Sequence, residues 1–141
     1  MRRTVYHHVR AKATLAVAAH SATANGTSVD RKLSGADGTN EWFESATLLV
    51  HAGTITDGSH AIKLQDSDNG TDWTDVAAKY LQGTLPTIAA ADDDKVYEVG
   101  YTGNARYLRA VATVTGSPET GGIYGATILL GFPTVLPISR T

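Results

Sequence analysis

RYLRAVATVT, residues 106–115, shows the clearest strand pattern in this sequence. Leucine, alanine or valine stands at each even position from 108 to 114, and this two-residue period is typical of a β-strand with one face on a core. The odd positions are partly apolar as well: Tyr107, Arg109, Val111 and Thr113. The second face of the strand is therefore expected to be covered or to form an interface.

Short runs of the same kind recur along the chain, separated by Gly, Asp, Asn, Ser and Thr. They predict strands over residues 14–20, 28–33, 42–52, 60–65, 72–76, 80–85, 95–101, 106–115 and 123–130, with no helix required. Short strands joined by regular turns bury their apolar faces best as two packed sheets. The sequence therefore predicts an all-β protein, a two-sheet antiparallel β-sandwich of jelly-roll type.

The 141 residues suit one domain, and residues 13–132 show no internal boundary or repeat. We expect this β-sandwich domain to be flanked by a basic N-terminal arm, residues 1–12, and an extended C-terminal tail, residues 133–141, which Pro133 and Pro137 hold extended. The chain has no cysteine. Its apolar runs fall short of the roughly 20 residues that cross a bilayer, and we expect no signal peptide.

The net charge of −2 hides an asymmetry. Arg2, Arg3, Arg10 and Lys12 place four positive charges in the first twelve residues, which leaves 8 basic against 14 acidic residues in the remainder. A basic arm on an acidic body is typical of a chain that reaches onto another surface; a solvated, disordered terminus is the alternative. Because the body is acidic and the excess of basic charge is confined to the arm, nucleic-acid binding is not expected.

Residues 66–73, DSDNGTDW, form the most distinctive local pattern. A calcium loop would use its alternating oxygens, but the closing glutamate of such a loop falls at Ala77 and the flanks read as strands. A structural hairpin similar to the Asp-box is favoured. We predict that Asp68 accepts hydrogen bonds from the amides of its own turn, that Gly70 is left-handed, and that Trp73 packs on the core.

The sequence offers no pattern for catalysis. None of the five histidines, at positions 7, 8, 20, 51 and 60, has metal-ligand spacing. His51 and His60 are the one pair that a hairpin could bring together. No serine has the glycines of a nucleophile elbow, and no glycine loop has a phosphate-binding lysine. Asp92 to Asp94 are interpreted as a solvated loop, with a cation or basic partner as the alternative. We expect no enzyme activity, no metal and no cofactor.

The stretch YTGNARYLR, residues 101–109, reads as a tight turn between two aromatic-bearing strands. Arg106 and Arg109 are three residues apart, so they are expected on opposite faces. Arg106 either pairs with a carboxylate at the sheet edge or belongs to an interface. The candidate contacts with a partner surface are Arg2, Arg3, Arg10, Lys12, Arg106 and Arg109.

The order of motifs is informative as a whole. GTITDG at 53–58 precedes a strand and the turn at 66–70; VYEVGY at 96–101 leads to RYLR at 106–109 and TVTG at 113–116, and a Gly-rich strand and proline follow. Over residues 45–133 this order resembles the small head-decoration proteins of tailed bacteriophages. The resemblance implies a β-sandwich that sits outside an icosahedral shell, often as a homotrimer, and cements neighbouring capsomers without chemistry.

The partner implied by this resemblance is the major capsid protein, and the implied location is the capsid surface of a virion assembled in the host cytoplasm. Two alternatives stay open. The chain is another virion part, such as a head–tail joining or tail protein, or it is a carbohydrate-binding β-sandwich that uses Trp42, Trp73 and tyrosines as sugar platforms. Copy number in particles separates the first alternative, and an exposed pair of coplanar aromatics would favour the second.

Overall fold

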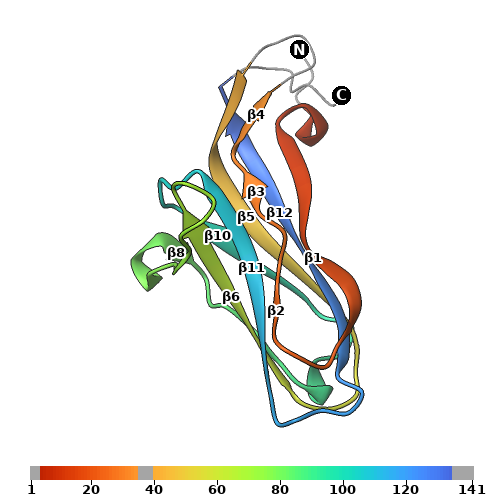
Figure 1. Ribbon diagram of the computed structural model, residues 1–141. Coiled ribbons are helices and arrows are strands. Elements are labelled where there is room, and N and C mark those ends of the chain that lie inside the picture. Colours follow the sequence, from red (N-terminus) through yellow and green to blue (C-terminus); the bar gives the residue numbers. More distant parts are fainter. Residues whose placement is uncertain (1–3, 35–39, 135–141) are drawn as a thin grey trace.

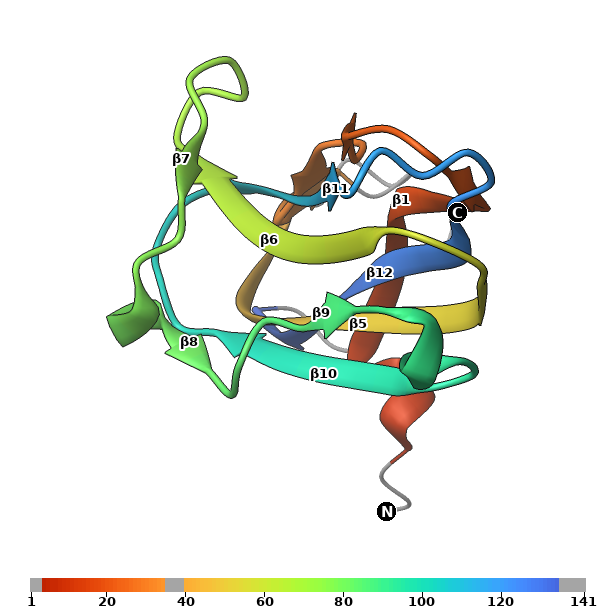
Figure 2. The same ribbon diagram turned by 90° about the horizontal axis from the view of Figure 1, so that it is seen from below.

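The computed structural model of the protein describes residues 4–34 and 40–134. Two antiparallel sheets pack face to face, which confirms the predicted all-β, two-sheet sandwich (Figure 1). Figure 2 shows the layers, with β6 and β11 on one side and β5, β10 and β12 on the other. We name the layers the β5 sheet and the β11 sheet.

The β5 sheet has the strand order β1, β12, β5, β10, β8, and β4 pairs with β5 as well. Its strands span Val9–His20 (β1), Gly122–Pro133 (β12), Asn40–Ile55 (β5), Val96–Tyr101 (β10), Leu81–Gln82 (β8) and Lys32–Ser34 (β4).

The β11 sheet has the order β2, β11, β6, β7, and β3 and β9 pair with β11 and β6. Its strands span Ala24–Asn25 (β2), Tyr107–Thr115 (β11), Ser59–Ser67 (β6), Thr74–Asp75 (β7), Val29–Asp30 (β3) and Thr87–Ile88 (β9). Three short 3-10 helices complete the described chain: Val5–His7 (η1), Ala78–Tyr80 (η2) and Ala90–Asp92 (η3). No helix in this described part is long and apolar enough to cross a membrane.

Alternate side chains of both sheets meet in one core. The even positions of β11 point inward as the sequence predicts, and Leu108, Ala110 and Ala112 are buried. They face buried residues of the β5 sheet: Phe43, Leu48, Val50, Tyr124, Ile128 and Leu130. Burial of these apolar side chains is the main term that stabilises the sandwich, at about 1.5–3 kcal/mol for each large one.

The first strand begins at Val9, inside the predicted arm. Arg10 and Lys12 therefore belong to β1, where they pair with Leu130 and Ile128 and are half-buried. β1 is an edge strand, and long basic side chains there can bury their stems while they discourage edge-to-edge pairing. Residues 1–3, with Arg2 and Arg3, lie outside the described residues, as do residues 135–141 of the predicted tail.

A buried arginine ties the chain together near β3. Arg31 is 2% exposed, and its guanidinium lies 5.1 Å from the ring centre of Trp42 and 5.5 Å from that of Tyr101. It donates hydrogen bonds to four backbone carbonyls, those of Phe43, Glu44, Gly103 and Ala105. One side chain thereby joins β5 to the loop at residues 103–105. Burial lowers the pKa of Arg31.

Buried polar groups close the other end of the sandwich. His60 of β6 is fully buried, and its Nδ1 lies 2.9 Å from the hydroxyl of Tyr124 in β12. The Nε2 of His60 lies 3.0 Å from the carbonyl oxygen of Asp57, and the Asp57 carboxylate accepts hydrogen bonds from backbone amides of residues 119–121. His51 lies exposed on β5, in the other sheet, so His51 and His60 do not form the pair that a hairpin would make.

Candidate functional site

The outer face of the β11 sheet gathers the most distinctive side chains. Tyr107 and Arg109 occupy outward positions of β11, and their partners across the sheet are Ser67 and Gln65 of β6. Asp75 of β7 pairs with Gln65 on the side of β6 that is away from β11. Three neighbouring strands therefore present polar and aromatic side chains side by side on one outer surface.

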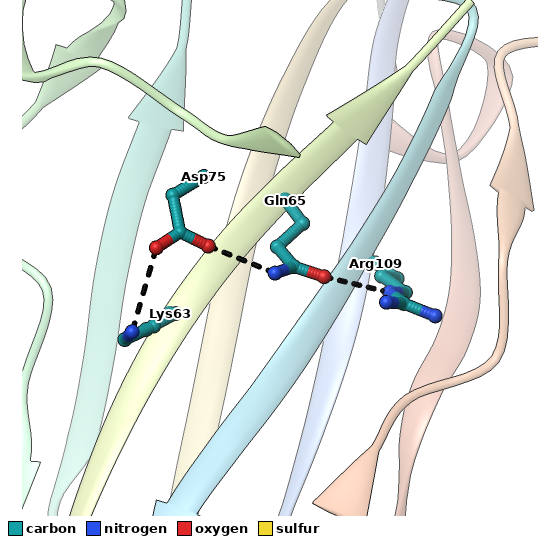
Figure 3. A network of polar contacts seen from close by, with 4 residues as sticks. All are labelled: Lys63, Gln65, Asp75 and Arg109. Atoms are coloured by element: carbon teal, nitrogen blue, oxygen red, sulfur yellow. Dashed lines mark hydrogen bonds and ion pairs between the residues drawn. The ribbon is translucent and has the colours of Figure 1, made fainter. Parts of the chain in front are cut away.

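A chain of polar contacts crosses this face (Figure 3). Arg109 Nε donates to Gln65 Oε1 at 2.9 Å, and Gln65 Nε2 donates to Asp75 Oδ1 at 2.8 Å. Lys63 Nζ lies 3.4 Å from the other oxygen of Asp75. The hydrogen bond from Gln65, followed by that from Lys63, holds the pKa of the Asp75 carboxyl below its usual value. Each side chain is thus fixed by its neighbours.

Two arginine–aromatic pairs lie on the same outer face of the β11 sheet. The Arg109 guanidinium lies 4.4 Å from the ring centre of Trp73, and that of Arg106 lies 5.0 Å from the ring centre of Tyr107. Such cation–π contacts orient both partners and add about 0.5–1 kcal/mol each at exposed sites. We name the surface formed by Arg106, Tyr107, Arg109 and Trp73 the arginine–aromatic face.

Arg106 is held on this face by a carboxylate. Its Nε and Nη2 donate to the two oxygens of Asp30, both at 2.8 Å, which is a bidentate ion pair. Burial alone would raise the pKa of Asp30, but the hydrogen bonds from Arg106 and from the Lys32 amide outweigh it and lower that pKa. The carboxylate pairing considered for Arg106 is therefore present.

The prediction that Arg106 and Arg109 lie on opposite faces is wrong. β11 begins at Tyr107, so Arg106 precedes the strand and the alternation does not apply to it. Asp30 is paired with Tyr107 in the sheet, so the two side chains share one face. The ion pair with Asp30 therefore places the Arg106 guanidinium on the face of Tyr107, 5.0 Å from its ring centre.

The turn at residues 66–73 differs from its prediction in the side chains that accept its hydrogen bonds. Ser67 Oγ accepts from the amides of Asn69 and Gly70, and Asn69 Oδ1 accepts from those of Thr71 and Asp72. Asp68 accepts none of these bonds, because Ser67 and Asn69 occupy the acceptor positions, and its side chain is exposed. Gly70 is left-handed with φ of 78°, as predicted.

Trp73 is also placed differently from its prediction. It is half-buried beneath Arg109 on the outer surface and does not join the core. Figure 2 shows the β6–β7 turn projecting away from the two sheets. The inward position after the turn is taken by Val76, whose amide donates to the Leu64 carbonyl.

A polar cleft of about 490 Å³ lies beside the face, between this turn and the loop at residues 103–105. Its lining includes the carboxylates of Asp66, Asp68 and Asp72 and the amide of Asn104. The Tyr101 hydroxyl fixes one wall, because it donates to Asp66 at 2.8 Å and accepts from the Ala105 amide at 3.1 Å. Burial, followed by the bond to Asp66, raises the pKa of Tyr101 to about 12. In the described part of the chain no group of three metal-binding side chains comes together.

The structure brings together some of the candidate residues and separates others. Arg106, Arg109 and Trp73 all belong to the arginine–aromatic face, where Arg106 contacts Tyr107 and Arg109 contacts Trp73. Gly70 lies against this face, since a Cβ at that position would be 3.6 Å from the Tyr107 ring. Arg10 and Lys12 lie in the other sheet. Asp30, Gln65 and Asp75 also belong to this site but were not predicted, because only strand register places them beside the arginines.

Searches of the chain against protein-family models, curated proteins and solved structures give no match. The geometry of the described residues is therefore the basis for assigning a function.

Proposed function

We propose that this chain is a non-enzymatic virion structural protein that binds the outer surface of a tailed-phage capsid and cements it. The observation that carries the proposal is the pair of arginine–aromatic contacts fixed side by side on one outer sheet face. Trp, Tyr and Arg are the residue types that dominate the energy of protein–protein interfaces. A surface that is already ordered loses little side-chain entropy when a partner covers it.

The mode of action is burial of surface, with no bond made or broken. A chain seated across the joint between two capsomers adds contact area to both, so the joint opens only when that contact is lost. The major capsid protein is the proposed partner, and the resemblance of residues 45–133 to head-decoration proteins supports this choice.

A carbohydrate-binding module is the second candidate, and the polar cleft is the observation that favours it. Its volume of about 490 Å³ falls within the usual range of 300–1,000 Å³ for small-ligand sites. Its carboxylates and amides suit hydroxyl groups, and Tyr80, one of its lining residues, is exposed. Trp42 and Trp73 are less suited to form a sugar platform, because each has an arginine over its ring.

The test is to quantify the protein on purified phage particles that lack it, by cosedimentation after titration. On the order of hundreds of bound copies support decoration, whereas about a dozen indicate a connector. Arg109→Ala and Trp73→Ala should each weaken binding by about tenfold or more. Glu98→Ala, on the outer side of the β5 sheet, is the matched control and should bind like the unmodified chain.

Two results contradict the proposal. Absence of binding to any particle, together with binding to an oligosaccharide array that Asp72→Ala abolishes, would favour the second candidate. Unchanged binding by folded Arg109→Ala and Trp73→Ala would show that the arginine–aromatic face is not the contact.

A further inference from the structure

Arg109 carries hydrogen-bond donors that the described part of the chain leaves unused. A guanidinium has five N–H groups, and the one on Arg109 Nε donates to Gln65 Oε1. The others, on Nη1 and Nη2, have no acceptor among the described residues. Arg31 and Arg106 differ, because Arg31 uses Nε and both Nη atoms, and Arg106 uses Nε and one Nη. The Nη end of Arg109 is therefore open to an acceptor from another molecule.

The contacts of Arg109 hold this open end in one orientation. Asp75 accepts from Gln65 Nε2, so the amide oxygen of Gln65 faces Arg109 and accepts from its Nε. The ring of Trp73 lies against the guanidinium, with its centre 4.4 Å away. In Figure 3 the outer end of the guanidinium points away from Gln65. An arginine that is already oriented loses little side-chain entropy when an acceptor binds to it.

The charge of Arg109 has no carboxylate partner either. Two neighbouring cations on this outer face do have one: Arg106 donates to both oxygens of Asp30, and Lys63 Nζ lies 3.4 Å from Asp75. Among the described residues no carboxylate contacts Arg109. One uncompensated positive charge therefore remains on this face, although the chain as a whole has a net charge of −2.

We propose that Arg109 binds a carboxylate of the protein that covers this face, with its two Nη atoms on the two carboxylate oxygens. The planar guanidinium matches a carboxylate in such bidentate pairs. The proposal rests on the proposed function and names the chemistry of the contacted capsid residue, a single aspartate or glutamate. A nucleic-acid strand fits less well, because its row of phosphates would be repelled by Asp66, Asp68 and Asp72 in the adjoining cleft.

The test is an NMR titration of the full chain that follows the indole N–H signal of Trp73, the ring that Arg109 covers. The probe is a capped peptide with one glutamate among neutral residues, and the same peptide with glutamine should leave the signal in place. Arg109→Gln should raise the dissociation constant of the glutamate peptide about fivefold. Arg109→Lys keeps the charge but loses the bidentate geometry, and should raise it by a smaller factor. Lys95→Gln is the matched control, because it removes one positive charge outside this face; it should bind like the unmodified chain.

Thermal unfolding shows that each variant is folded. Equal shifts with the glutamate and glutamine peptides, or unchanged glutamate-peptide binding by Arg109→Gln, would overturn the proposal. A short oligothymidylate that shifts the Trp73 signal at lower concentration than the glutamate peptide would overturn it as well, in favour of a nucleic-acid partner.

Cosedimentation with particles separates this proposal from the proposed function. Particle binding that Arg109→Gln leaves unchanged would overturn the carboxylate contact while the capsid remains the partner. Glutamate-peptide binding that depends on Arg109, without binding to particles, would support the carboxylate site and contradict the capsid as the partner.

Discussion

Replacement of Arg31 by methionine tests how strongly the buried guanidinium holds the fold. Methionine keeps an unbranched apolar stem and removes four donated hydrogen bonds, so four carbonyls lose their partner: those of Phe43, Glu44, Gly103 and Ala105. At about 1 kcal/mol for each net hydrogen bond, the loss is roughly 4 kcal/mol. Removal of a buried charge offsets part of this loss. We therefore expect the free energy of unfolding to fall by about 3 kcal/mol.

Urea denaturation followed by circular dichroism measures this change, and the midpoint of thermal unfolding should fall by roughly 10 °C. Arg109→Met is the matched control, because Arg109 is only half-buried and its contacts lie on the surface; it should cost no more than about 1 kcal/mol. If Arg31→Met remains within about 1 kcal/mol of the unmodified protein, the carbonyls find other partners and the reasoning fails.

Three further predictions follow from the turns. Asn69→Ala should lower the free energy of unfolding by about 1–2 kcal/mol because two amides lose their acceptor. Asp68→Ala should change it by no more than about 0.5 kcal/mol in the same urea assay. Calcium should not shift the melting temperature of either variant. Trp73→Ala should cost about 1 kcal/mol, well below the roughly 3–5 kcal/mol of a core tryptophan, since the ring lies under Arg109 on the surface; a core-sized loss in denaturation would contradict this placement. The hydrogen bond from the Gly121 amide, followed by those from its neighbours, lowers the pKa of Asp57 from 3.8. Ionised Asp57 therefore stabilises the fold fully above its unfolded pKa, and this stabilisation is lost as the pH falls through the lower folded pKa. Melting curves between pH 5 and pH 2 should show a steeper fall in melting temperature for the unmodified chain than for Asp57→Asn.

The strands and the placement of Gly70 follow from local chemistry, which explains why sequence reasoning reached them. Alternation over residues 107–115 specifies one inward face whatever the rest of the chain does. Gly70 follows from turn geometry alone, because a left-handed position has little choice of residue. The predicted strands at 72–76 and 80–85 shrink to two residues each, β7 and β8, because a short pairing at a sheet edge has no periodic signal.

The rest depends on contacts between distant segments. Arg31 stands between Asp30 and Lys32 in what looks like a charged surface turn, and its acceptors Gly103 and Ala105 are more than 70 residues away. The outward placement of Trp73 likewise depends on Arg109 in another strand. Sequence periodicity records which side of a strand is apolar, but it does not record which strands become neighbours.

Hydroxyl-radical footprinting of the chain, free and bound to particles, shows whether the arginine–aromatic face contacts a capsid. We expect Trp73 and Tyr107 to become protected on the particle, while Val96, exposed on the opposite sheet, is labelled as in the free chain. Bound protein in which Trp73 and Tyr107 are labelled as strongly as in solution would contradict it.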